Sequence, residues 1–339
     1  EENMRQGAAN YLQWMKVERG LRDRLKWLVN AESSSDIALL KNTSEGLSLI
    51  AYGMDWQPGD NIVSTNQEFP SNRIVWESLK SKGVELRLAD ISGDDPEGEL
   101  IKLVDKNTRL ITVSSVQFAT GIRMHLKRLG EFCRERDIFF CIDAIQSLGA
   151  VQFDVQDVYA DAVVADAHKW LFGPEGIALF YISPQWREKL ALHQFGWHMV
   201  ERAGDFDAVQ WQPAKSARRF EPGSPNMLGI HALNASLSLF EEIGMDEVEK
   251  QLLERSRLLM DQISEHRELE LITPATSGRY AGIVTFRHRD LDNNAHAALY
   301  RKLMASGIIC AHRAGGIRFS PHYYTDSSRF EHLWKEIFS

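Results

Sequence analysis

Apolar residues recur along this chain with two different spacings. Between residues 37 and 182, seven short runs rich in apolar or β-branched residues predict strands. These runs are 37–40, 61–64, 85–88, 110–113, 138–142, 162–165 and 176–182. Helical spacing marks 8–30, 74–82, 97–103 and 126–136. Near-continuous apolar strands alternating with helices predict an α/β fold with a mostly parallel, seven-stranded sheet covered on both faces.

The pattern changes after Phe220. Residues 226–264 have helical spacing throughout. Their candidate buried positions are Leu228, Leu233, Leu237, Leu239, Phe240 and Ile243. Strands at 282–286, 308–310 and 317–319 and a closing helix at 329–337 follow. We therefore expect a large domain over 1–244, including the N-terminal helix, and a smaller C-terminal α+β domain over 245–339.

Composition places the chain among ordinary globular proteins. Of its 339 residues, 44% are hydrophobic and 25% are charged, and this length suits two domains. A net charge of -8 without a long basic block argues against a nucleic-acid or membrane-surface partner. No apolar run reaches about 18 residues, so no membrane span is predicted.

Three scattered cysteines, Cys133, Cys141 and Cys310, form neither a disulfide framework nor a zinc motif. We therefore expect a cytoplasmic protein and no metal site. The N-terminus has no apolar stretch of the signal-peptide kind. It begins abruptly with helix-forming residues, from which we expect an upstream piece to be absent.

Ligands of open α/β sheets bind beyond the carboxyl ends of the strands. After the first strand, the segment 42–46 leads into a helical pattern, so its small residues offer a phosphate site at a helix start. An ordinary N-cap is the simpler alternative. Asp143 immediately follows the fifth strand, where a half-buried acid calls for a cationic partner such as a protonated pyridine. A capping aspartate is equally compatible with that position.

Lys169 follows the sixth strand, between His168 and Trp170 and ahead of the turn GPEG at 173–176. Enclosure and neighbouring cations would lower its pKa, as an amine that forms a Schiff base requires. A surface lysine is the usual alternative for any single lysine. Because Asp143 and Lys169 follow successive strands, we expect both to face one crevice.

Together these segments resemble the class V aminotransferases, a group of pyridoxal 5'-phosphate (PLP) enzymes of fold type I. The resemblance is carried by DAIQS at 143–147, HK at 168–169 and GPEG at 173–176, in that order. It extends from about residue 10 to the end of the chain. The group includes cysteine desulfurases, selenocysteine lyases, isopenicillin-N-epimerase-like proteins and kynureninases. The resemblance implies PLP as the cofactor and the PLP-dependent transferase fold of type I.

The resemblance also implies a role for each residue at the ring end of the cofactor. Lys169 would be the catalytic Schiff-base lysine, and Asp143 would pair with the pyridine nitrogen. Gln146 would lie near the 3′-oxygen, with Gln117 as a weaker contact. Phe69 would stack on the ring, at a place where desulfurases usually have a histidine that can offer a proton.

At the other end, the resemblance places Thr43, Ser44 and His168 around the phosphate. Ser224, in the loop RFEPGSPN at 219–226, would contact the phosphate of a neighbouring subunit, which implies a homodimer with shared active sites. Arg318 would bind the substrate's α-carboxylate, for which a planar guanidinium is well suited.

Two departures from the desulfurase pattern matter. Asp166 stands where desulfurases commonly have a small hydroxyl residue near the phosphate, so we expect it to turn away or to engage a cation such as an arginine. Desulfurases present a nucleophilic cysteine shortly before the carboxylate-binding arginine. Here Cys310 lies in the predicted strand at 307–311, where we expect it to be buried and inert. We expect Cys133 and Cys141 to lie in the core.

The resemblance implies an enzyme that acts on a small amino acid after the substrate amine displaces Lys169. The freed lysine would remove the α-proton, and the fate of the resulting carbanion decides the reaction. We rank transamination first and a C–S or related lyase reaction second, with epimerisation as a further alternative. A PLP-binding protein without turnover is the alternative outside enzymes. A nucleotide-binding protein is disfavoured because neither GxGxxG nor GxxxxGK(S/T) occurs.

Overall fold

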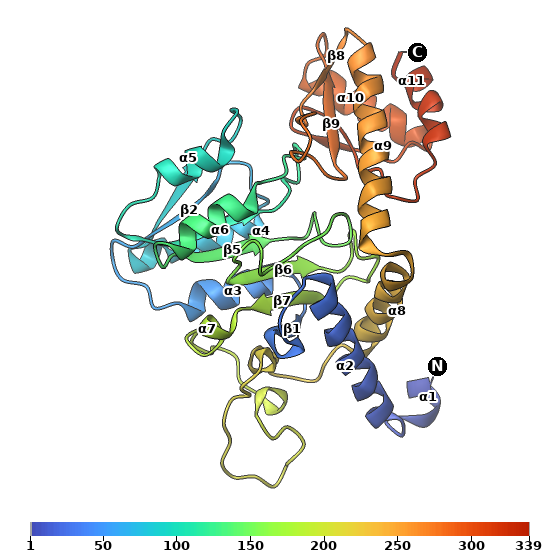
Figure 1. Cartoon of the computed structure of the whole chain (residues 1–339). Helices are drawn as coiled ribbons and strands as arrows, with labels where there is room; N and C mark the ends of the chain where they lie inside the picture. Colours follow the sequence, from blue (N-terminus) through green and yellow to red (C-terminus); the bar gives the residue numbers. More distant parts are fainter. Residues whose placement is uncertain (1, 339) are drawn as a thin grey trace.

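One large sheet forms the centre of the computed structural model, which describes residues 2–338 (Figure 1). Its strands are β1 (Ile37–Leu40), β2 (Asn61–Thr65), β3 (Glu85–Ala89), β4 (Thr108–Ser114), β5 (Phe139–Asp143), β6 (Ala162–Asp166) and β7 (Ala178–Ile182). They are arranged in the order β1-β7-β6-β5-β4-β2-β3. Only β7 runs antiparallel to its neighbours, β1 and β6, whereas the other pairs are parallel. The predicted mostly parallel, seven-stranded sheet is confirmed.

Helices cover both faces of this sheet because successive side chains of each strand point to opposite sides. In β5, Phe140 and Ile142 belong to the core on one face, whereas Phe139 and Cys141 belong to the core on the other. The first face is covered by α2 (Tyr11–Leu28), α5 (Pro96–Lys102), α6 (Leu126–Arg134) and α8 (Met227–Ile243). The second is covered by α3 (Thr43–Gly53) and α4 (Ser71–Glu77). Two short helices, α1 (Glu2–Gln6) and α7 (Pro184–Arg187), lie at the periphery.

A second sheet with its own core lies at the far end of the long helix α9 (Met245–Glu265) (Figure 1). Its strands are β8 (Leu269–Leu271), β9 (Val284–His288), β10 (Ala311–Arg313) and β11 (Gly316–Phe319), in the antiparallel order β10-β11-β9-β8. The helices α10 (Asn293–Ala305) and α11 (Phe330–Phe338) accompany it. Phe286, Leu303 and Ile317 are fully buried in this second core. We propose Gly244, which separates α8 from α9, as the domain boundary.

The strands of the large sheet begin and end within two residues of their predicted positions, but the C-terminal part required corrections. The helical stretch 226–264 is interrupted at Gly244, whose φ of +85° favours glycine. Leu228 and Leu239 are 83% and 48% exposed rather than buried. No strand covers 308–310, since β10 begins at Ala311. The spacing analysis also missed α10.

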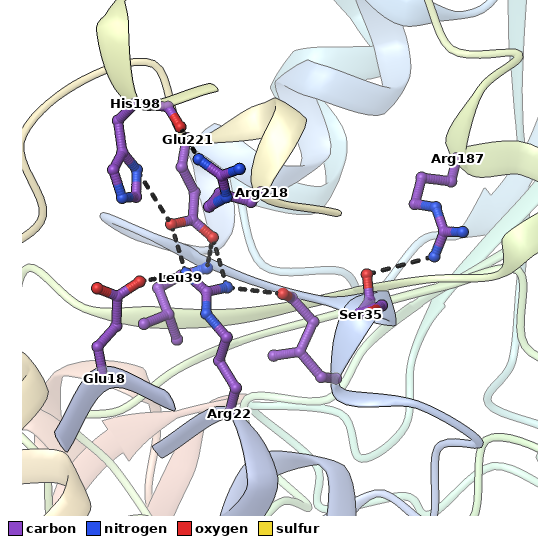
Figure 2. A network of polar contacts seen from close by, with 9 residues as sticks. Glu18, Arg22, Ser35, Leu39, Arg187, His198, Arg218 and Glu221 are labelled. Atoms are coloured by element: carbon purple, nitrogen blue, oxygen red, sulfur yellow. Dashed lines mark hydrogen bonds and ion pairs between the residues drawn. The ribbon is translucent and has the colours of Figure 1, made fainter. Parts of the chain in front are cut away.

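A buried ion network joins α2 to the loop that precedes α8 (Figure 2). The Arg22 guanidinium donates to both carboxylate oxygens of Glu221, each at 2.7 Å, and to Glu18 at 2.6 Å. The backbone N–H of Leu39 in β1 also donates to Glu221. Glu18, Glu221 and His198 offer three potential metal-ligand atoms within 4.8 Å of one another. Because Arg22 bridges both carboxylates with its positive charge, we interpret the cluster as an ion network.

Within residues 2–338, none of the helices combines the length and the apolar character needed to cross a membrane.

Candidate active site

The carboxyl ends of β5 and β6 bring the two central residues of the predicted site to one edge of the sheet. Asp143 is the last residue of β5, and Lys169 follows β6 by three positions. The two strands are parallel neighbours, with Asp143 opposite Val164. Two segments 26 positions apart in the chain therefore place an acid and an amine at the same edge of the sheet, where each affects the pKa of the other.

Lys169 is half-buried, and its Nζ lies 5.7 Å from the centre of the Phe69 ring. Burial lowers the pKa of Lys169, and the positive charge of Arg318 lowers it further. The carboxylates of Asp143 and Asp166 act in the opposite direction. The net shift favours the neutral amine, which is the form that attacks a carbonyl or accepts a proton.

Asp143 is almost completely buried, with 2% of its surface exposed. Burial raises its pKa to about 7, and the nearby charge of Glu68 contributes to the rise. The carboxylate accepts a hydrogen bond of 3.0 Å from the backbone N–H of Ile145. A carboxylate this buried is stabilised by a cationic partner, and a protonated pyridine nitrogen is one that PLP would bring.

Gln146 is held by a neighbour that sequence analysis did not assign. The indole N–H of Trp170 donates to Oε1 of Gln146 at 2.9 Å, and both residues are buried. Because the amide oxygen is occupied, its NH₂ group remains the part of the side chain that can donate to a ligand oxygen. This orientation suits the predicted contact with the 3′-oxygen.

One side of the site is formed by residues outside the strands of the large sheet, namely Phe69, Phe118 and Arg318. The rings of Phe69 and Phe118 pack edge to face with centroids 5.2 Å apart. Arg318, on β11, donates from Nη1 to the carbonyl oxygen of Phe118 at 2.6 Å. Its Nε is buried and has no hydrogen-bond partner within residues 2–338. A guanidinium with an unused buried donor is suited to an anionic ligand such as a carboxylate.

The predicted phosphate end differs from expectation. Thr43 begins α3, but its backbone N–H and its hydroxyl both contact the carboxylate of Asp166. His168 is exposed, and its Nδ1 lies 3.5 Å from Asp166. Ser44 is exposed and hydrogen-bonds Ser71 at 2.9 Å. Asp166 was expected to turn away from the phosphate or to engage a cation such as an arginine. Its carboxylate contacts the N-terminus of α3, with His168 beside it.

Ser224 lies outside this cluster, whereas Cys310 shares a cavity with Arg318. Ser224 is exposed in the loop between Phe220 and α8. Cys310 was predicted to lie in a strand, but it lies directly before β10. It is half-buried. It lines a cavity of about 860 Å³ to which Arg318 also contributes. Burial raises the pKa of this thiol to about 11, so it is protonated at neutral pH and a weak nucleophile.

A buried carboxylate beside the site escaped sequence analysis. Glu68 accepts hydrogen bonds from Ser114, through both N–H and hydroxyl, and from the Gln117 amide at 3.0 Å. Thr65 and Asn72 donate to it as well. Because the Glu68 carboxylate accepts hydrogen bonds from all these donors, it fixes the turn that carries Phe69. The available signal was an acid three positions after the buried β2 strand, preceded by two amide residues.

The fold and the geometry of the ring end define a PLP-dependent enzyme of fold type I. The model of the family Aminotransferase class-V matches residues 4–333, and the chain belongs to this family. A probable cysteine desulfurase of Pyrococcus abyssi is 32% identical over an alignment of 324 residues, which covers 89% of this chain and 78% of the relative.

Two solved structures of the protein C-DES are similar in fold. One is a mutant with glycine covalently linked to its PLP cofactor, with a TM-score of 0.90, 23% identity and coverage of 99% of this chain and 89% of the other. The second is described as the cystine C–S lyase C-DES in complex with its reaction product cysteine persulfide. Its TM-score is 0.88 at 24% identity, with 97% of this chain and 88% of that chain covered.

Proposed function

We propose that this PLP enzyme is a C–S lyase, which cleaves the Cβ–S bond of cysteine, cystine or a related amino acid. The observation that carries the proposal is the series of contacts from Lys169 to the Phe69 ring, from Phe69 to Phe118, and from Phe118 to Arg318. The nearby Cys310 thiol has a raised pKa and is a weak nucleophile. The similarity to cysteine desulfurases supports sulfur amino acids as substrates. The description of C-DES as a cystine C–S lyase supports direct C–S cleavage. The lyase alternative is therefore better supported than transamination, which the sequence analysis ranked first.

In this proposal the residues of the chain bind and orient the cofactor. Asp143 would pair with the ring nitrogen, Gln146 would donate to the 3′-oxygen and Phe69 would stack on the ring. Thr43, Ser44 and His168 surround the phosphate. Bound PLP supplies the electron sink that accepts the electron pair left by removal of the α-proton.

The chemical steps are then assigned to Lys169 and Arg318. Arg318 binds the α-carboxylate and orients the substrate, and the neutral amine of Lys169 accepts the α-proton. The Cβ–S bond breaks, and its electron pair leaves with sulfur as sulfide from cysteine or as cysteine persulfide from cystine. Hydrolysis of the remaining three-carbon fragment gives pyruvate and ammonia. No protein thiol takes part in these steps.

We further propose that the enzyme is a cytoplasmic homodimer. Cys133, Cys141 and Cys310 are all free, as expected in a reducing compartment. Ser224 is exposed, so it is accessible to the phosphate site of a second subunit. The segment before it carries exposed apolar side chains, including Phe206 at 79% and Val209 at 95%, which suit a subunit contact.

An assay of products tests the lyase proposal. Purified enzyme is incubated with L-cysteine or L-cystine, and sulfide or persulfide is measured together with pyruvate. Equal amounts of pyruvate and released sulfur are expected, without any added amino acceptor. Conversion that requires a keto acid and yields a new amino acid would instead support transamination.

Cys310→Ala is the variant that separates direct cleavage from the desulfurase route. Because the pKa of Cys310 is raised to about 11, we expect the variant to release sulfur from cystine at the rate of the unmodified enzyme. Loss of sulfur release with retained cofactor would show that this thiol is the nucleophile and would contradict the proposal.

Arg318→Leu is expected to raise KM for the amino acid by roughly 10- to 100-fold, because it removes a charge-assisted contact to the α-carboxylate. Arg318→Lys keeps the charge but loses the bidentate geometry. Its KM should therefore lie between that of the unmodified enzyme and that of Arg318→Leu. Steady-state kinetics measure both. Arg313→Leu, which removes an exposed arginine from the adjacent β10, is the matched control and should leave KM unchanged. An unchanged KM in Arg318→Leu would exclude carboxylate binding at this position.

A further inference from the structure

The carboxylate of Asp166 occupies the N-terminus of α3, where the proposed function places the phosphate of the cofactor. It accepts hydrogen bonds from the backbone N–H of Thr43 and, at 3.3 Å, from the Thr43 hydroxyl. The contact is reciprocal, because the backbone N–H of Asp166 donates to the same hydroxyl at 3.2 Å. Asp166 is thus bound to the start of α3 through both its backbone N–H and its side-chain carboxylate.

Asp166 supplies an anion from the chain itself to the Thr43 N–H, while the side chain of Asn42 caps the N–H of Glu45. The N-terminus of a helix favours negative charge, and its free N–H groups suit either a carboxylate or a phosphate. Both anions cannot use the Thr43 N–H together, and two adjacent negative charges repel. Burial raises the pKa of Asp166, whereas its hydrogen bonds with Thr43 and the nearby His168 and Lys169 act in the opposite direction.

We propose that Asp166 is a competing anion, whose carboxylate holds the N-terminus of α3 in the absence of cofactor and is displaced when the phosphate binds. The inference rests on the proposed function, since it concerns the phosphate end of the same site. It makes Asp166 a positioning residue that weakens PLP binding. The enzyme then binds its cofactor less tightly than the same site would with a hydroxyl residue at this position.

His168 provides the place to which the displaced carboxylate moves. Its Nδ1 already lies 3.5 Å from Oδ2 of Asp166, so a rotation of the aspartate side chain converts this approach into a hydrogen bond. Paired in this way through Nδ1, the imidazole keeps its other nitrogen free to donate to the phosphate. The predicted role of His168 at the phosphate is thereby retained, but it depends on Asp166.

The test compares PLP binding by the unmodified enzyme, Asp166→Ser and Asp166→Asn. The holoenzymes are diluted or dialysed, and the dissociation constant is obtained from the visible absorption band of the bound cofactor. Asp166→Ser should bind PLP at least about tenfold more tightly, because one charge-assisted hydrogen bond no longer has to be broken. Asp166→Asn removes only the charge and should give a smaller gain. Glu175→Ser removes an exposed carboxylate near the site and should leave the affinity unchanged.

Thermal unfolding gives a second measurement that does not depend on turnover. Without cofactor, Asp166→Ser should unfold at a lower temperature than the unmodified protein, because the contact with Thr43 is lost. With saturating PLP the order should reverse. Inorganic phosphate should likewise stabilise cofactor-free Asp166→Ser more than the unmodified chain.

Each outcome separates this inference from the proposed function. PLP affinity that is equal or weaker in both Asp166 variants, with PLP bound by the unmodified enzyme, overturns the competing-anion role alone. Failure of the unmodified enzyme to bind PLP overturns the proposed function. If Asp166→Ser does not fold, the isosteric Asp166→Asn still decides the question.

Discussion

Lys169→Ala is expected to eliminate the visible absorption band of the enzyme and to lower turnover by roughly 10²- to 10⁴-fold. The variant loses the amine that is proposed to bond the cofactor and to accept the α-proton. Burial and Arg318 lower the pKa of Lys169, so the amine is more available at neutral pH than that of an exposed lysine. Absorbance spectroscopy measures the first effect, and pyruvate release from cystine measures the second.

Two controls distinguish loss of chemistry from loss of structure. Lys189→Ala removes an exposed lysine after β7 and should change neither the band nor the rate. Adding a small primary amine such as methylamine to Lys169→Ala should restore part of the turnover, because an external base can then accept the α-proton. A fully active Lys169→Ala enzyme would contradict the assignment of this lysine and the proposed mechanism with it.

The sequence predicted the part of the site that follows from strand order. Asp143 and Lys169 lie just beyond two apolar runs, and parallel strands place such positions at one edge of the sheet. Arg318 could not be located in this way, because it reaches the site through a contact with Phe118, 200 positions earlier in the chain. Its predicted role depended on the resemblance to the family, and the free Nε supports that role independently.

The differences from prediction have physical causes. Asp166 was expected to turn away or to engage a cation such as an arginine, because a carboxylate repels a phosphate. The structure shows that the start of α3 attracts the carboxylate itself. Cys310 was assigned to a strand because two isoleucines precede it, but Ile309 is 83% exposed and the strand begins one residue after the cysteine. Apolar spacing over so few residues does not distinguish a strand from an extended loop.

Sequence analysis could not predict the long-range hydrogen bonds and ion pairs of the buried carboxylates. Glu68 depends on donors from Ser114 and Gln117, and Arg22 contacts Glu221 at a separation of 199 positions. The sequence next to Glu68 or Glu221 does not indicate which distant residues contact these carboxylates. These buried charges nevertheless determine the positions of the turn with Phe69 and of the loop with Ser224, and so connect the stability of the fold to the shape of the site.

Arg22→Met is expected to lower the free energy of unfolding by about 3–5 kcal/mol. The substitution keeps most of the side-chain volume but leaves Glu18 and Glu221 buried without their shared cation. A loss of this size is a large fraction of a typical total of about 5–15 kcal/mol. Denaturant unfolding at pH 7 measures it, and a lower midpoint with an unchanged slope is the expected result.

Arg24→Met is the matched control on the same helix. Arg24 pairs with Glu241 at 2.8 Å, but both side chains are partly exposed, so its removal should cost no more than about 1 kcal/mol. Combining Arg22→Met with Glu18→Gln and Glu221→Gln should recover much of the stability, since the uncompensated charges are then absent. If Arg22→Met costs no more than Arg24→Met, the network does not carry the buried charge that its geometry indicates. If the triple variant recovers nothing, packing around Arg22 is more important than its charge.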